Sequence, residues 1–392
     1  MSALTYSPYD YSMHEDPYPT YALLREQAPI YRNDDFDFWT LTRHADVYAA
    51  GRDPLTYSNS RGVNLELWSE DLAKRQSFIA MDPPDHTQFR RLVSKGFTPR
   101  RVAELEPRIR QITRGYLSAA LDAQGEFDFI ADLAQNIPAD VISELVGVPV
   151  TDRKQILAWS NESLGRDEVT GAVTAASAAA TRELMGYYAQ LIADRRAHLG
   201  DDLVSALIAA EIDGEQLSDT DIGAVLLLLG VAGNESTTKI LGNAWYQAAR
   251  HPDQRRTAFQ LGRIDGWMEE TLRYDSSGQM TARLVTRDVE WYGNTVPAGA
   301  RLLLIFAAAN RDPRVFPSPD TFDISRDTSA AIAFGTGPHF CLGASLARLE
   351  TRVVLDELVA TVHEDYEVGM PVRVHHPNIH GLASLPTVVK AR

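Results

Sequence analysis

The chain contains a single cysteine, Cys341, in the segment FGTGPHFCLG at residues 334–343. The glycines around it permit unusual backbone angles and let a large flat group come close. The apolar residues that follow, from Leu342 to Val353, have helical spacing. We therefore expect the thiol to lie just before a helix N-terminus, where free N–H groups and the helix dipole favour a thiolate.

Two interpretations of Cys341 are open at this point. A cysteine beside a glycine-rich turn is often a buried apolar side chain. A lone thiolate on an open loop, with no second cysteine and no histidine at metal spacing, suits one axial bond to a haem iron better than a zinc site. A single cysteine also forms no internal disulfide, which fits a reducing compartment. We expect a cytoplasmic protein.

The 392 residues show no linker, repeat or low-complexity tract, so we expect one domain over 1–392. Apolar residues spaced by three and four predict helices over five segments: 100–122, 152–165, 171–198, 219–250 and 342–361. Strand patterns are fewer, with one strand over 38–42 and a hairpin over 289–296. The sequence therefore predicts a mainly α protein with a minor β part.

The longest predicted helix, 219–250, begins after Ser218, which can cap it, and ends before His251 and Pro252. Its most apolar stretch is shorter than the roughly 18 residues of a membrane span, so we expect a buried helix and no membrane span. The N-terminus lacks the basic and apolar regions of a signal peptide. The motif AGNESTT at 232–238 places a carboxylate and three hydroxyls in this apolar helix, and burying them costs free energy unless they are paired or used.

The formal net charge of -15 argues against a nucleic-acid partner. One segment is net positive although the chain is net negative: the window 90–114 holds eight basic and two acidic residues. The window can be a solvated helix face or a docking surface for an acidic protein.

Four segments, in order along most of the chain, carry a family resemblance. FGTGPHFCLG resembles the haem-ligand signature of the cytochrome P450 superfamily, Phe-Gly-x-Gly-x-His-x-Cys-x-Gly, at every defined position. AGNESTT is similar to the oxygen-activation segment of the family's central helix, and 270–273 to its Glu-x-x-Arg motif. MDPPDHTQFRRLVSKGFTPR, at 81–100, is similar to the segment of bacterial members that contacts the haem propionates. The chain is identified as a member of the bacterial type.

The resemblance implies the P450 fold, a helix-rich lobe with a small β-rich lobe, and haem b (iron protoporphyrin IX) with Cys341 as the ligand of the metal. It assigns cofactor contacts to nine further residues: His86, Arg90, Ala232, Gly233, Arg283, Phe334, Gly335, His339 and Gly343. Of these, the two histidines His86 and His339 and the two arginines would hold the propionates.

The resemblance also assigns catalytic and structural roles. Glu235, Ser236 and Thr237 would deliver protons during O2 activation. Glu270 and Arg273, one helical turn apart, would pair with each other and with Arg326 in a structural role.

The chain departs from the family pattern in two places. Ser236 stands where the family commonly has threonine. Serine keeps the hydroxyl but lacks the methyl group that fixes the rotamer. Ser277 and Gly278 replace a common proline and bulky residue, which leaves extra room beside the haem. The segment 61–78 is the expected lid, and lid loops usually determine specificity.

No functional role is expected for the remaining histidines. His375, His376 and His380 are expected in a loop, because Pro377 disfavours a helix there. Five others are expected at the surface: His14, His44, His198, His251 and His363.

The resemblance predicts a monooxygenase that inserts one atom of O2 into a small apolar substrate, with electrons from NAD(P)H through a reductase and a ferredoxin. We expect it to be a monomer. Steroids, terpenoids, fatty acids and natural-product intermediates all remain open as substrates. One alternative keeps the haem but uses peroxide or performs oxidative coupling, and the acid and alcohol at 235–236 count against the peroxide version. A non-enzymatic haem sensor is the other alternative.

Overall fold

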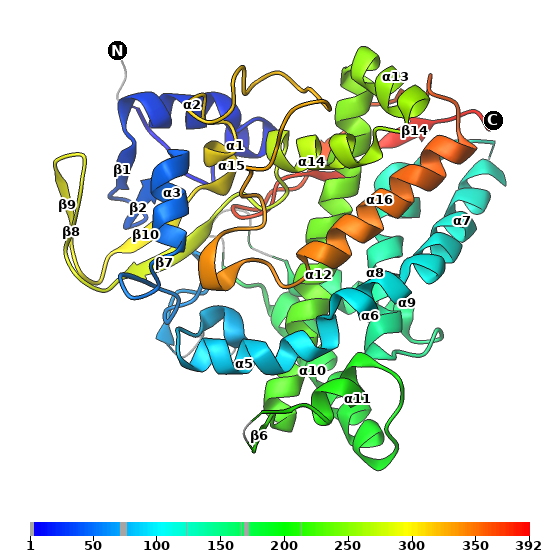
Figure 1. Ribbon diagram of the computed structural model, residues 1–392, viewed down its shortest axis with the longest axis horizontal. Coiled ribbons are helices and arrows are strands. Elements are labelled where there is room, and N and C mark those ends of the chain that lie inside the picture. The colour runs from blue at the N-terminus through cyan, green and yellow to red at the C-terminus, as the bar shows by residue number, and fades with distance from the viewer. Residues whose placement is uncertain (1–3, 71–76, 123, 166, 168–171, 213) are drawn as a thin grey trace.

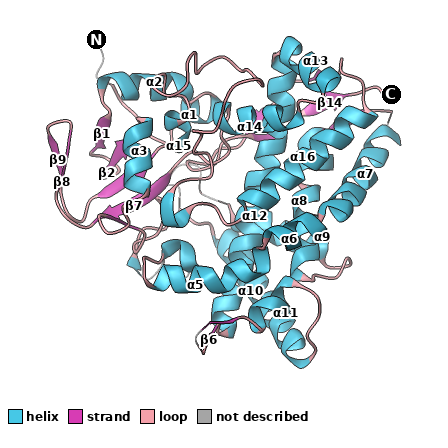
Figure 2. Cartoon of the chain, in the orientation of Figure 1, coloured by secondary structure: helices cyan, strands magenta, loops and turns pink. Residues whose placement is uncertain are grey.

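The computed structural model describes residues 4–392 except 71–76, 123, 166, 168–171 and 213. Most of its helices gather in one large lobe, and most strands lie together on the opposite side of the molecule with α1, α2, α3 and α15 beside them (Figures 1 and 2). The mainly α fold with a smaller β-rich lobe is therefore confirmed. The expectation of a single domain over 1–392 stays a prediction.

The described helices follow one another along the chain with few long interruptions. They are α1 (Tyr11–Glu15), α2 (Tyr18–Gln27), α3 (His44–Gly51), η1 (Ser77–Ala80), α5 (Asp85–Ser94), η2 (Lys95–Phe97), α6 (Pro99–Glu104), α7 (Glu106–Asp122), the π-helix η3 (Phe129–Ala134), α8 (Asn136–Val146), α9 (Arg153–Ser163), α10 (Ala175–Ala197), α11 (Leu203–Ile208), α12 (Asp219–Arg250), α13 (Pro252–Leu261), α14 (Ile264–Tyr274), α15 (Phe306–Ala309), η4 (Gly337–His339) and α16 (Ala344–Thr361).

The described strands are short. They are β1 (Ile30–Asn33), β2 (Phe38–Leu41), β3 (Tyr57–Ser58), β4 (Glu126–Asp128), β5 (Glu211–Ile212), β6 (Glu215–Gln216), β7 (Thr281–Val285), β8 (Val289–Trp291), β9 (Asn294–Val296), β10 (Arg301–Leu304), β11 (Glu367–Val368), β12 (Val372–Arg373), β13 (Leu382–Ser384) and β14 (Pro386–Val388). The main sheet has the order β1-β2-β10-β7-β3, and the smaller sheets are β11-β14-β4, β12-β13, β5-β6 and the predicted hairpin β8-β9.

Helix α12 is the central element of the helical lobe. Its predicted start is confirmed, because Ser218 and Asp221 form a reciprocal capping box. It packs against α8, α9, α10, α14 and α16. Among the described residues it is also the one helix long and apolar enough to cross a membrane, but half of its most apolar window is buried inside the protein. We therefore read α12 as a core helix.

The predicted helix over 100–122 is two helices in the structure, α6 and α7. Pro107 explains the break, because its nitrogen has no N–H to donate to the carbonyl four residues earlier and its ring would clash with that carbonyl. Thr98 caps α6 by accepting a hydrogen bond from the Arg101 N–H at 3.3 Å. The break turns α7 towards α16, against which it packs closely.

Strand β7 carries side chains from the β-rich lobe to the centre of the molecule. It pairs antiparallel with β10, with Arg283 opposite Leu302. Because side chains alternate along a strand, Thr281 and Arg283 point to one face and Ala282 to the other. Ala282 joins the core of the β-rich lobe, while Thr281 and Arg283 line the cavity described next.

Candidate functional site

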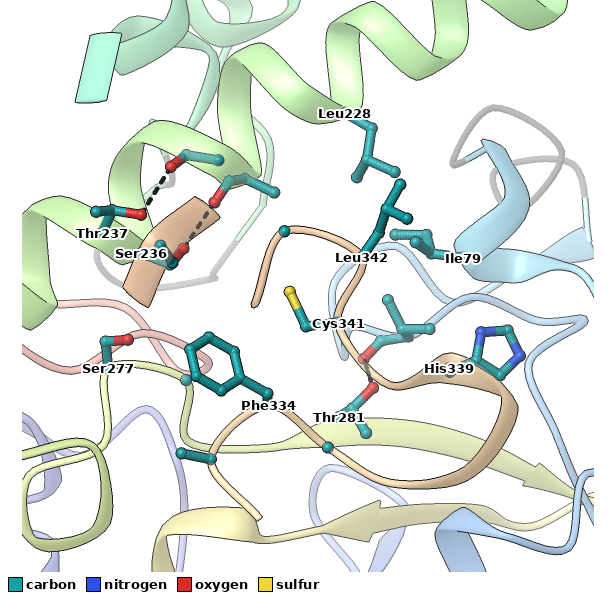
Figure 3. A pocket seen from close by; sticks show the side chains of 18 of the residues that line it. Ile79, Leu228, Ser236, Thr237, Ser277, Thr281, Phe334, His339, Cys341 and Leu342 are labelled. Atoms are coloured by element: carbon teal, nitrogen blue, oxygen red, sulfur yellow. Dashed lines mark hydrogen bonds between the residues drawn. The ribbon is translucent and has the colours of Figure 1, made fainter. Parts of the chain in front are cut away.

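A cavity of about 400 Å³ lies between the two lobes, and Cys341 is part of its wall. Figure 3 shows the sulfur of Cys341 facing the open space, with Ser236 and Thr237 of α12 on one side and His339 on the other. Most of the wall is apolar, and its lining includes Ile79, Leu228, Phe334 and Leu342. The cavity therefore brings together residues from all four motifs, with Leu272 as the contribution of the 270–273 segment.

The loop before α16 holds Cys341 by its backbone. The Cys341 N–H donates to the Phe334 carbonyl at 2.9 Å, which closes the loop. Gly337 has a φ of +69°, and a Cβ built on it would lie 2.3 Å from the Gly51 carbonyl oxygen of α3. Any side chain at 337 would push the loop off α3, so glycine is required for this close approach.

The electrostatics of Cys341 differ in part from the expectation. Burial raises the pKa of its thiol, and the Gly343 and Ala344 N–H groups and the cations Arg90 and Arg348 act in the opposite direction. The helix N-terminus thus has the predicted effect, but desolvation exceeds it in the protein alone. A bound metal ion would favour loss of the proton, because it deprotonates a coordinating thiol.

One end of the cavity is cationic. Arg90, Arg283 and His339 belong to the lining, whereas His86 lies just outside it with its ring centroid 4.0 Å from that of His339. Burial lowers the pKa of Arg283 to about 10, of His86 to about 4 and of His339 to about 2. Within the described chain, both ring nitrogens of His86 and Nε2 of His339 are buried without a hydrogen-bond partner.

These observations test whether a haem fits. A planar apolar group with two carboxylates matches an apolar cavity that has a thiol in its wall and the guanidinium groups of Arg90 and Arg283 at one end. An N–H on the unpartnered ring of His86 and another on Nε2 of His339 would each find an acceptor in a propionate oxygen. Gly335 and Gly343 keep the wall open beside the thiol, since a Cβ on either would meet its nearest neighbour only at 3.8–3.9 Å. The residues present fit the group.

The polar segment of α12 divides between two environments. Ala232, Gly233, Ser236 and Thr237 line the cavity. The Ser236 hydroxyl donates to the Ala232 carbonyl at 2.8 Å, and the Thr237 hydroxyl donates to the Gly233 carbonyl at 3.1 Å (Figure 3). Both hydroxyls keep acceptor capacity towards the cavity.

Glu235 is not part of the cavity lining. Its carboxylate pairs with Lys239 of the next turn, with Oε1 and Nζ 2.9 Å apart. The sequence analysis missed Lys239, although a glutamate four residues before a lysine is the favourable order for such a pair. It also missed Glu350, a fully buried and cavity-lining acid whose pKa is raised well above its ordinary value by burial.

The predicted Glu270, Arg273 and Arg326 cluster is confirmed in its geometry. Arg273 donates from Nε and Nη2 to the two oxygens of Glu270 at 2.7 and 2.8 Å. Arg326 donates to Glu270 Oε1 at 3.2 Å. Arg273 also donates to the carbonyls of Asn310 and Pro319, so the cluster fixes the irregular segment that leads to the Cys341 loop.

The expected lid over 61–78 is only partly described, because 71–76 lie outside the described residues. Val63 and Phe78 line the cavity. The Val63 carbonyl accepts from the Ala282 N–H at 2.7 Å, and Leu65 is buried in the core of the β-rich lobe. The described first part is therefore anchored to β7. Ser277 and Gly278, expected to leave room, both line the cavity.

The net positive charge of the basic window, 90–114, is smaller in the folded protein than its sequence suggests, because most of its arginines are paired with carboxylates. Arg110 and Arg114 pair with Glu357 of α16, Arg108 with Glu144, and Arg100 with Glu104. Glu144 and Glu357, which lie outside the window, therefore neutralise part of its charge, and a count over the window alone could not include them. Arg91 and Lys95 are exposed, and in the part of the chain that the structure describes neither forms an ion pair with a carboxylate.

The surface position expected for His14 is wrong. His14 is only 7% exposed, because its ring packs against His375 and Tyr11. His380 is also buried, and its Nε2 lies 3.2 Å from Asp275.

Comparisons with known proteins agree with the site. A family model described as Cytochrome P450 matches residues 264–385. A Mycobacterium tuberculosis chain described as a cytochrome P450 numbered 123 is 49% identical over 99% of this chain and 98% of its own. The vitamin D(3) 25-hydroxylase of Pseudonocardia autotrophica is 39% identical over 96% and 95% of the two chains. The structure of CYP109E1 from Bacillus megaterium with corticosterone has a TM-score of 0.86 at 28% identity, over 96% of this chain and 99% of that chain.

Proposed function

The chain belongs to the cytochrome P450 family of haem-dependent monooxygenases, and from this premise we propose that it hydroxylates or epoxidises an apolar substrate of steroid size. The reaction would consume O2, two electrons and two protons, place one oxygen atom in the substrate and release the other as water. One observation supports this most directly: a thiol, two hydroxyls and two arginines converge on one mainly apolar cavity. Cytoplasmic location and a monomeric state belong to the same proposal.

The family's cofactor would be held by Cys341 through its sulfur and by Arg90, Arg283, His86 and His339 at the cationic end. When bound, a thiolate-ligated haem supplies the activation of O2, since electron donation from sulfur favours cleavage of the O–O bond. The apolar wall contributes by excluding water from the reacting centre. Gly335 and Gly343 contribute by leaving space for a flat group.

Ser236 and Thr237 would hold and pass protons at the cavity wall. Each hydroxyl already donates to a backbone carbonyl one turn earlier, so each can accept a hydrogen bond from a water in the cavity. Glu235 would relay protons from solvent water to these hydroxyls from the adjacent side of α12. In this proposal the hydroxyls act directly and Glu235 acts through them.

The variant Ser236→Ala tests the hydroxyl role. We expect haem content and substrate affinity near wild type, but about tenfold less product per NADPH, with the missing electrons recovered as hydrogen peroxide. This loss is smaller than the roughly 10²–10⁴-fold rate enhancement that a positioned proton donor contributes, because the hydroxyl of Thr237 remains. Thr238→Ala is the matched control, since its hydroxyl is buried against the Ala134 and Asn234 carbonyls. Equal coupling in wild type and Ser236→Ala would remove Ser236 from the path.

The substrate class rests on the walls and on relatives. Apolar side chains dominate the cavity, and Gly278 leaves open space, because a Cβ built there meets no atom within 4 Å. A relative named for vitamin D(3) and a neighbour solved with corticosterone support rigid polycyclic molecules. A screen of steroids, terpenoids and fatty acids for ligand-induced shifts of the haem spectrum would test this. A response confined to linear fatty acids would contradict the steroid-size proposal.

Electrons would come from NAD(P)H through a reductase and an acidic ferredoxin. Arg91, Lys95 and the exposed Phe340 lie around the loop side of the site, where Arg90 is hydrogen-bonded to the Phe340 carbonyl. Unpaired cations steer an acidic partner, while paired ones contribute little. The effective docking charges would therefore be at 91 and 95 rather than at Arg100 and Arg101, which lie within ion-pair distance of Glu104 and Asp201.

We expect Arg91→Glu with Lys95→Glu to raise the apparent KM for ferredoxin about tenfold at low salt, with substrate affinity unchanged. The effect should shrink as salt shortens the Debye length to about 8 Å at 0.15 M. Arg100→Glu with Arg101→Glu changes the net charge equally and serves as the positional control. If both pairs leave the KM unchanged, this surface is not the docking site.

The two rival functions have direct tests. A peroxide-driven enzyme would turn over with hydrogen peroxide and gain nothing from ferredoxin and NADPH. A haem sensor would bind CO when reduced but oxidise no member of the substrate screen. The hydroxyls of Ser236 and Thr237 in the cavity wall favour the monooxygenase over both.

A further inference from the structure

Glu235 and Lys239 form an ion pair inside the protein. Their side chains are only 16% and 5% exposed, and Oε1 and Nζ are 2.9 Å apart. A charge removed from water to this degree is costly unless an opposite charge compensates it. The pair therefore fixes both the charge and the direction of the Glu235 carboxylate, one residue before the cavity-lining Ser236.

Gly381 makes room for the lysine. A Cβ built on Gly381 would lie 2.6, 2.8 and 2.9 Å from Cβ, Cγ and Cδ of Lys239. These atoms form the base of the stem, which cannot swing aside as a side-chain end can. The φ of Gly381 is not in the left-handed region, so alanine is excluded here by the lysine and not by the backbone.

We propose that Lys239 is a positioning residue that holds the carboxylate of Glu235 ionised beside Ser236, and that Gly381 keeps Lys239 in place. This inference rests on the proposed proton-delivery role of Glu235 and extends it to two residues that do not line the cavity. Lys239 acts through Glu235, and Gly381 acts through Lys239.

The positioning role of Lys239 predicts different effects for substitution by methionine and by arginine. Lys239→Met keeps an unbranched stem but removes the positive charge, so Glu235 would be left mostly buried without a counter-charge and would take up a proton. A protonated carboxyl is also free to turn away from its present direction. Lys239→Arg keeps the charge and should retain much of the pairing.

The main experiment compares coupling, defined as product formed per NADPH consumed, in the reconstituted holoenzyme. We expect Lys239→Met to lose as much coupling as Glu235→Gln, and Lys239→Arg to recover most of it, with substrate affinity close to wild type. Gly381→Ala should reproduce the loss, and combining it with Lys239→Met should add nothing. Gly186→Ala, where a Cβ meets no atom within 4 Å, is the matched glycine control.

A second readout is independent of turnover. The infrared difference spectrum between Lys239→Met and Lys239→Met with Glu235→Gln should contain the C=O stretch of one protonated carboxyl. The difference spectrum between wild type and Glu235→Gln, which both keep Lys239, should contain the bands of an ionised carboxylate instead. A protonated Glu235 already present beside Lys239 would overturn the proposal.

The outcomes separate this inference from the proposed function. If Glu235→Gln keeps full coupling, the proton-delivery role of Glu235 fails and the inference fails with it. If Glu235→Gln lowers coupling while Lys239→Met does not, only the positioning role is overturned. Additive losses in the Gly381→Ala and Lys239→Met double variant would overturn the part assigned to Gly381.

Discussion

Replacing Cys341 with histidine is expected to abolish the red-shifted absorption band that thiolate ligation gives to a reduced, CO-bound haem, and to abolish monooxygenase turnover with it. The reason is electronic, because imidazole lacks the electron donation by which a thiolate favours O–O cleavage. Since Cys341 is the chain's single cysteine, no other thiol can replace it. The loss should be complete rather than partial.

The measurement separates ligation from binding. Haem content should be determined beside the CO spectrum, because Arg283, His339 and His86 would still offer contacts to the propionates. A variant that binds haem and shows a histidine-type spectrum supports the assignment. Persistence of the thiolate band in Cys341→His would show that the band does not report this residue.

Glu270→Gln should lower the free energy of unfolding by about 3–5 kcal/mol, the typical cost of removing one partner of a buried ion pair. Glu270 and Arg273 are both fully buried, and the substitution leaves Arg273 without its bidentate partner. Total stabilities are about 5–15 kcal/mol, so this loss is a large share. Urea denaturation followed by circular dichroism, with the yield of haem-loaded protein, would measure it.

The neighbouring residue offers a matched control. Glu269 also pairs with an arginine, but its side chain is 26% exposed and that of Arg348 is 37% exposed. Glu269→Gln makes the same chemical change in a solvated pair and should cost at most about 1 kcal/mol. Equal losses in Glu269→Gln and Glu270→Gln would mean that burial of the pair does not matter.

Short-range patterns predicted the local structure well. The start and end of α12 followed from a cap and a proline, and both are confirmed. The break between α6 and α7 was missed, although Pro107 could have indicated it. The cluster of Glu270 with Arg326, 56 residues apart, was predicted from the family resemblance and not from spacing.

Contacts between distant segments were beyond prediction from one sequence. The positive charge of Arg110 is neutralised by Glu357, 247 residues away. The burial of His14 depends on His375, and the space for Lys239 depends on Gly381. In each case the property belongs to a tertiary contact, and a local count of charges or apolar residues does not contain it.

The close contact between the Cys341 loop and α3 has a consequence for how this protein can change over evolutionary time. Gly337 and Thr336 fasten the loop to Gly51 and Tyr48, whereas Val63, Ile79 and Leu228 form other parts of the wall from separate segments. Mutations in the second group can accumulate while the anchorage of the reactive centre is inherited unchanged. Laboratory libraries aimed at new substrates should therefore vary 63, 79 and 228 and leave 51, 336 and 337 untouched.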